Sequence, residues 1–103
     1  MNREDIKSIL IPNGVEEIEC GAFQECINLE KIIIPESVIK IGRSAFYNCE
    51  KLIEIKLPTS LTVINGFVFC GCSSLLSVHI PYEVHQELHL LHQNVGTDIR
   101  FGF

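Results

Sequence analysis

The feature that most constrains this chain is a pattern that returns every 23 residues without an insertion. Ile11, Ile34 and Leu57 open three successive copies, and Ile80 stands where a fourth would begin. A fixed period of about 20 to 50 residues is typical of solenoids, in which each repeat forms one coil and contacts only its neighbours. The sequence therefore predicts a stack of coils, an architecture that usually binds other molecules and rarely catalyses.

The copies define a single expected domain over residues 1–103. Its parts are a partial coil (1–10), three repeats (11–33, 34–56 and 57–79) and a C-terminal cap (80–103). Hydrophobic residues make up 47% of the chain, which is enough to fill a core.

Each coil should contribute one short strand. The segments Leu29–Pro35, Leu52–Pro58 and Leu75–Pro81 share apolar residues that alternate with polar ones before a proline. This alternation predicts a strand, and proline should end it because proline cannot donate a ladder hydrogen bond. Strands of successive coils should then form one short parallel sheet, with about 4.8 Å between neighbours.

The other half of each coil carries a recurring Phe-x-x-Cys sequence. Phe23, Phe46 and Phe69 should stack as an aromatic spine. The run from Phe to Cys is long enough only for one or two helical or 3₁₀ turns. The residue after each Phe, such as Tyr47, should face outward.

The chain has five cysteines, an odd number that does not suit a disulfide framework. Cys26, Cys49 and Cys72 share one repeat position, whereas Cys20 and Cys70 do not. A column of small buried hydrophobic side chains explains this spacing better than a metal or redox site, since free cysteine packs as a small hydrophobe. The cysteines are predicted to be reduced.

The C-terminal segment changes period. Val84, Leu88, Leu91 and Val95 fall on one helical face, and Gly96 can end that helix. Residues 98–103 can add a last strand. A terminal unit that departs from the repeat is typical of a cap.

The repeats follow the pattern L-x-x-I-x-[IL]-P-x-x-[VL]-x-x-I-x-x-x-[AV]-F-x-x-C over residues 6–81. This pattern resembles the BspA-like, or treponemal-type, leucine-rich repeat family. The resemblance implies an α/β fold: a right-handed leucine-rich-repeat solenoid with a short parallel β-sheet and a C-terminal helical cap. It also implies a non-enzymatic protein that binds other proteins, typically on bacterial or protist surfaces, with no catalytic residues and no cofactor.

The net charge and the hydropathy of the chain limit the kinds of partner that it is expected to bind. The formal net charge of −5 argues against nucleic acid, which calls for a basic face. No stretch is apolar enough to insert in a membrane, and the opening MNREDIKSIL has no signal-like apolar run. We expect a cytoplasmic protein if this is the full chain, and a cell-surface or secreted one if it is a fragment.

Histidines and cysteines offer two chemical alternatives. His85, His89 and His92 share a stripe of the expected helix, where i, i+4 spacing can hold zinc. That stripe borders the apolar face, where histidine is common without metal, and the HExxH pattern is absent. A Cys–His nucleophilic pair is disfavoured because the repeat cysteines should be internal. We therefore assign no metal or catalytic site.

The exposed face of the parallel sheet is the candidate binding site. Register should place Lys7 beside Glu30, Lys31 beside Glu54, Leu10 beside Ile33 and Ile53 beside Leu76. The candidate residues are Lys7, Leu10, Lys31, Ile33, Ile53, Glu54, Lys56, Leu76, His79 and Tyr82. A face that only contacts solvent does not need four exposed aliphatic side chains, which favours a binding face. The alternative is an inert, solvated face on which the charged residues form ladders of ion pairs.

We therefore expect a protein partner on this face. The alternative is self-assembly as a homodimer through the N-terminal strand edge, which has no dedicated cap sequence beyond the charges of residues 2–5.

Overall fold

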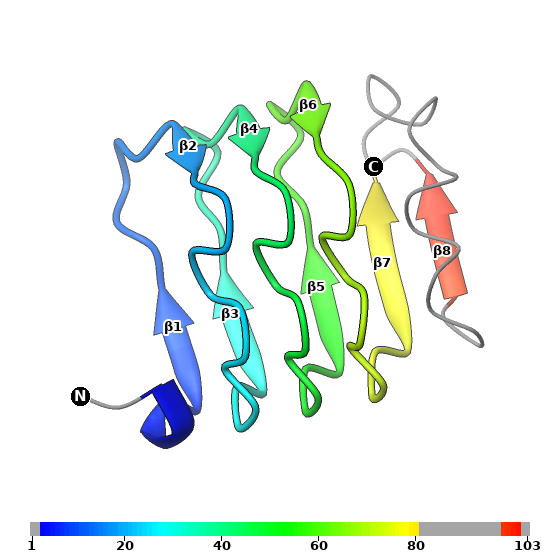
Figure 1. The fold of residues 1–103 in the computed structure, drawn as a ribbon. Helices are drawn as coiled ribbons and strands as arrows, with labels where there is room; N and C mark the ends of the chain where they lie inside the picture. Colours follow the sequence, from blue (N-terminus) through cyan, green and yellow to red (C-terminus); the bar gives the residue numbers. More distant parts are fainter. Residues whose placement is uncertain (1–2, 81–97, 102–103) are drawn as a thin grey trace.

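The computed structural model describes residues 3–80 and 98–101 (Figure 1). Its coils lie side by side, and each crosses two rows of strands. One row contains β1 (Ser8–Leu10), β3 (Lys31–Ile33), β5 (Glu54–Lys56), β7 (Ser77–Ile80) and β8 (Asp98–Phe101). The other contains β2 (Glu17–Ile18), β4 (Lys40–Ile41) and β6 (Val63–Ile64). A short 3₁₀ helix, η1 (Arg3–Asp5), precedes β1.

Strand pairing confirms the register that the repeat predicts. All pairs are parallel, and partners in successive coils differ by one period, as in Ser8 with Lys31 and Glu54 with Ser77. The last strand expected near the C-terminus is present as β8, which pairs with β7. The helix predicted over residues 84–95 lies outside the described residues, together with most of the expected cap.

The prediction of one parallel sheet is wrong. Each coil contains two extended segments rather than one. The second segments, β2, β4 and β6, form a second sheet that the sequence analysis did not predict. The first row is itself divided into β1–β3 and β5–β7–β8. Strands β3 and β5 lie side by side without being joined in a ladder.

The segments from Phe to Cys are turns rather than helical turns. Each is closed by a hydrogen bond from the Cys N–H to the Phe carbonyl oxygen, at 3.1–3.3 Å across the three coils. The residue directly before Cys is left-handed in all three coils: Glu25 has φ 60, Asn48 φ 57 and Gly71 φ 81. A right-handed helix cannot pass through such residues. The part of the chain that the structure describes therefore contains no α-helix and forms a β-rich repeat fold, while the C-terminal helical cap of the expected α/β fold falls on residues outside that part.

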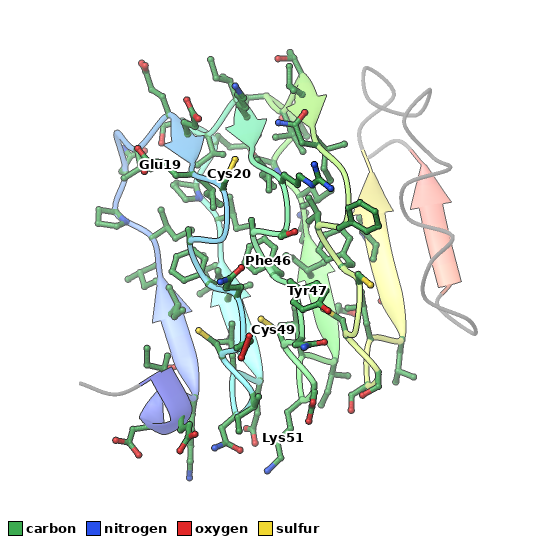
Figure 2. The ribbon with its side chains drawn as sticks, in the orientation of Figure 1. Glu19, Cys20, Phe46, Tyr47, Cys49 and Lys51 are labelled. Carbon is green, nitrogen blue, oxygen red and sulfur yellow. The ribbon has the colours of Figure 1, made fainter. Side chains whose placement is uncertain are left out.

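The core follows the predicted inward positions. Phe46 stacks between Phe23 and Phe69, with ring centroids 5.7 and 5.9 Å away, which confirms the aromatic spine (Figure 2). Phe46 and Phe69 are buried, as are the isoleucines of β2, β4 and β6. Tyr47, expected to face out, is half-buried.

The cysteine column is buried as predicted, and it has a role beyond packing. All five cysteines are free thiols. The Cys49 thiol donates to the Phe23 carbonyl oxygen at 3.2 Å, and the Cys72 thiol donates to that of Phe46 at 3.1 Å. Cys49 and Cys72 therefore each tie their own turn to the turn of the preceding coil.

Candidate functional site: the outer face of the first strand row

The outer face of β1, β3, β5 and β7, hereafter the sheet face, is set by strand alternation. The central residue of β3, Ile32, is 6% exposed, and that of β5, Ile55, is 1% exposed. Their neighbours in the same strands point outward and are exposed. Because side chains alternate along a strand, burial of one set fixes the other set on the outer face.

Four aliphatic side chains at this face are exposed, as predicted: Leu10 and Ile33 lie within β1 and β3, and Ile53 and Leu76 immediately precede β5 and β7. Their exposed fractions are 72% for Leu10, 49% for Ile33, 49% for Ile53 and 64% for Leu76. Leu10 pairs in register with Ile33. The Leu76 N–H donates to the Ile53 carbonyl oxygen at 2.7 Å, which sets these two residues side by side. The structure therefore brings both predicted apolar pairs together.

Charged groups flank these pairs. Lys7, Lys31, Glu54 and Lys56 are exposed, and His79 is half-buried in register with Lys56. The Glu30 N–H donates to the Lys7 carbonyl oxygen at 2.8 Å, in keeping with their predicted adjacency. The Glu54 carboxylate accepts a hydrogen bond from the Ser77 hydroxyl at 3.3 Å. The predicted pairing of Lys31 with Glu54 crosses the unjoined border of β3 and β5, and Tyr82 lies outside the described residues.

A hollow of about 360 Å³ lies between the carboxyl ends of β3 and β5. Its lining is mainly aliphatic, from residues 32–34 and Leu57, with Pro58. The Glu36 carboxylate forms one wall, held by the Thr59 N–H at 3.0 Å and by the Thr59 hydroxyl. Sequence reasoning missed this hollow because the repeat pattern is the same across β3 and β5 as elsewhere.

A second exposed apolar group lies beside β4 and β6, and the sequence analysis missed it. Ile39 is 47% exposed, Val63 41% and Phe67 39%. The Arg43 guanidinium lies 5.0 Å from the Phe67 ring centroid. The sequence hints at this apolar group only in that Ile39 and Val63 occupy the repeat positions at which the first coil carries Glu16 and Glu17. This group is the natural comparison for the sheet face, because its chemistry is similar and its location differs.

In residues 3–80 and 98–101, no group of three or more His, Cys, Asp or Glu side chains is arranged to hold a metal ion. His85, His89 and His92 lie outside those ranges. No helix within the described part of the chain has the length and hydropathy needed to cross a membrane.

Comparison with known proteins identifies one family to which the chain is similar. A model of the BspA type leucine rich repeat region matches residues 1–89. A leucine rich cell surface protein from Faecalibacterium prausnitzii A2-165 is 31% identical, with a TM-score of 0.70, over 73% of this chain and 20% of that one. A leucine-rich repeat protein from Bacteroides ovatus ATCC 8483 is 24% identical, with a TM-score of 0.61, over 95% of this chain and 30% of that one. The second likeness speaks for the fold alone.

The chain spans less than a third of either solved protein. No curated protein matches it.

Proposed function

Because the chain belongs to the BspA-type leucine-rich repeat family, we propose that it is a non-enzymatic protein-interaction module that binds its partner on the sheet face. The family points to protein interaction in general. The location on the molecule is inferred from the four exposed aliphatic side chains of that face, which is the observation that carries the proposal.

Two features of the sheet face support this choice. Aliphatic side chains surrounded by charges have the composition of an interface centre and its rim. Complete burial of a fully exposed Leu or Ile contributes about 1.5–3 kcal/mol. These four side chains are already partly buried, so each would contribute a part of that amount on binding. The hollow between β3 and β5 adds a recess beside Ile33 in which a partner side chain can be enclosed.

The expected interface is modest in size. Strands β1, β3 and β5 each present two outward residues, so even with the exposed residues beside them the sheet face is at or below the roughly 20 residues a side of a standard interface. The similarity to a cell surface protein supports the cell surface as the place where this module works.

The test compares two pairs of substitutions. Ile33→Asp with Ile53→Asp places two charges on the sheet face, and Ile39→Asp with Val63→Asp places two beside β4 and β6. All four side chains are between 41% and 49% exposed, so the two pairs should cost similar and small amounts of stability. We expect the first pair to abolish capture of the partner on immobilised protein, measured by quantitative mass spectrometry, and the second to preserve it.

The reverse result, with capture lost only in the Ile39 and Val63 pair, would place the binding site on the second sheet. Thermal melts of both variants are needed alongside. If only the Ile33 and Ile53 variant unfolds, those two side chains are buried rather than exposed, and the assignment of the sheet face is wrong.

A further inference from the structure

Five residues of the second and third coils form a strip at β4 and β6. The strand register places Val63 beside Lys40. The Val63 N–H donates to the Ile39 carbonyl oxygen at 3.2 Å. Further along the same two coils, the Arg43 guanidinium lies 5.0 Å from the centroid of the Phe67 ring. We call these five residues the β4–β6 strip.

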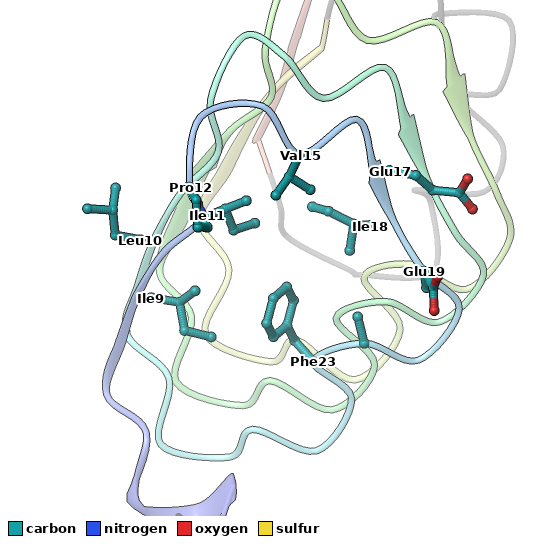
Figure 3. A pocket seen from close by; sticks show the side chains of 10 residues that line it. Ile9, Leu10, Ile11, Pro12, Val15, Glu17, Ile18, Glu19 and Phe23 are labelled. Carbon is teal, nitrogen blue, oxygen red and sulfur yellow. The ribbon is translucent and has the colours of Figure 1, made fainter.

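The β4–β6 strip lies on a different side of the coil from the sheet face. In the first coil, the repeat position of Lys40 and Val63 is held by Glu17. Figure 3 shows that Glu17 points out of the first coil, while Leu10 of the sheet face points out on the opposite side. A ligand on the strip therefore leaves the sheet face uncovered, and the site is additional to the proposed function.

The backbone of Phe67 is in an unfavourable conformation. Its φ of 60 is left-handed, which makes a bulky aromatic residue an outlier. Gly21 and Ser44 hold the same repeat position with φ 65 and 57, so the turn imposes this conformation in all three coils. Glycine adopts it without steric cost, whereas a residue with a Cβ does not. Because strained residues cluster at functional sites, a strained Phe67 that is 39% exposed is a candidate ligand contact.

The backbone that carries Arg43 is fixed from both neighbouring coils. The Arg43 carbonyl oxygen accepts from the Gly21 N–H at 2.9 Å. The next N–H, that of Ser44, donates to the Gly66 carbonyl oxygen at 3.0 Å. With the Phe67 ring beneath it, the guanidinium is therefore held in a defined place. A planar guanidinium stacked on an aromatic ring keeps its N–H edge free for a carboxylate, which it can bind through two hydrogen bonds.

Charge and exposure indicate what fits the strip. The Lys40 ammonium already lies 3.9 Å from the Glu17 carboxylate. Among the described residues, the Arg43 guanidinium has no carboxylate partner, so it can receive one from a ligand. Ile39 and Val63 are 47% and 41% exposed and offer aliphatic contact beside it. The complementary ligand therefore has an acidic group flanked by aliphatic ones.

We propose that the β4–β6 strip binds an extended segment of another polypeptide in which an acidic side chain has aliphatic side chains two residues away. The acidic side chain accepts two hydrogen bonds from the Arg43 guanidinium over the Phe67 ring. The aliphatic side chain lies on the same side of the segment and packs on Ile39 and Val63. From residue 63 to residue 67 the chain spans at most about 14 Å, which about four extended residues of the segment cover.

The probe is an acetylated and amidated synthetic peptide, SITETIS, whose isoleucines flank the glutamate on both sides. Titrated into the ¹⁵N-labelled full chain, it should give saturable amide shifts over residues 39–43 and 63–67. The matched peptide SITQTIS lacks only the carboxylate and should bind about tenfold more weakly. Equal affinity of the two would overturn the proposal. Tighter binding of SITQTI with a free terminal carboxylate would make a chain end the occupant, and would also overturn it.

Substitution of Arg43 tests the guanidinium. Arg43→Lys keeps the charge but loses the planar fork, so it should weaken binding of SITETIS by about tenfold, and Arg43→Gln by at least as much. The matched control, Lys31→Gln on the sheet face, makes the same change in net charge as Arg43→Gln and should leave the affinity unchanged. Equal weakening by the two Gln variants would mean that net charge alone attracts the peptide, which would overturn the proposal.

The two pairs of Asp substitutions separate this site from the sheet face. Ile39→Asp with Val63→Asp should abolish binding of SITETIS, whereas Ile33→Asp with Ile53→Asp should leave it unchanged. The pattern expected for the partner of the sheet face is the reverse, so failure of one proposal does not imply failure of the other. Peptide binding that is lost only in the Ile33 and Ile53 variant would overturn the strip as the site.

Two substitutions of Phe67 test the strain. Phe67→Gly and Phe67→Ala both remove the ring and should weaken peptide binding to a similar extent. Since glycine adopts the left-handed conformation without steric cost, Phe67→Gly should melt at a higher temperature than Phe67→Ala. The opposite order of melting, or undiminished peptide binding in either variant, would overturn the proposal. Dispersed ¹⁵N spectra establish that each variant is folded.

Discussion

Phe46 shows how one residue serves the whole repeat. Its ring lies between those of Phe23 and Phe69, nearly parallel to both, with interplanar angles of 15° and 6°. Its carbonyl oxygen accepts the thiol of Cys72 from the next coil. The same side chain therefore fills the core and stands in a column that joins all three full coils.

Phe46→Ala should accordingly destabilise the protein far more than Tyr47→Ala. Removing a fully buried Phe typically costs about 3–5 kcal/mol, comparable with the whole stability of a small domain. Tyr47 is half-buried, so its truncation leaves a smaller cavity and should cost less. Urea denaturation of the two variants measures both free energies of unfolding. Equal losses would mean that the inward register of this turn is wrong.

At the scale of elements, the border between β3 and β5 differs from the others. The N–H groups of Glu30 and Leu76 donate to carbonyl oxygens of the neighbouring coil at 2.8 and 2.7 Å. Ile53 holds the equivalent position between them. Among the residues that the structure describes, its N–H has no acceptor. The two parts of the first row, β1–β3 and β5–β7–β8, are thus held together here by side chains and by the second sheet, which continues from β2 through β4 to β6.

This border predicts a local difference in hydrogen exchange. The amide hydrogen of Ile53 should exchange at least about tenfold faster than those of Glu30 and Leu76, since a backbone group without an acceptor needs no opening of structure to exchange. Exchange followed by two-dimensional NMR measures all three in one sample. Protection of Ile53 equal to that of Leu76 would show that β3 and β5 are joined in solution.

At the scale of the whole molecule, coils are connected to coils by contacts one period apart. The Ser37 hydroxyl donates to the Val15 carbonyl oxygen at 2.7 Å, and the Ser60 hydroxyl to that of Val38 at 2.8 Å. On the outside, Glu17 and Lys40 pair across the same step. Each coil is therefore stabilised mainly by the coils next to it, as expected for a solenoid.

Thiol reactivity reports on this closed stack. In the native protein, Cys20 is exposed and should react first with a thiol reagent, followed by the partly exposed Cys70. Cys26, Cys49 and Cys72 are buried and should react only as the coils open. In denaturant without reductant, all five should be counted as free. A count of one would reveal two disulfides, and rapid native reaction of Cys49 would contradict the buried column.

The 23-residue period by itself determined much of this protein. It was sufficient to predict the stacked coils, the parallel register of the first strand row, the Phe spine, the buried Cys column and the outward pairs Leu10 with Ile33 and Ile53 with Leu76. These features depend on which side of the chain each residue faces, and hydrophobic periodicity records that directly.

Only the tertiary structure decided the rest. The second sheet depends on backbone pairing between coils, and Lys40 with Ile41 is too short a segment to carry a strand pattern. The left-handed residues Glu25 and Asn48 turn a predicted helical turn into a tight loop, although neither is glycine. The hollow between β3 and β5 lies where two successive coils are not joined by a ladder. A repeat that reads the same in every coil cannot show where stacking is interrupted.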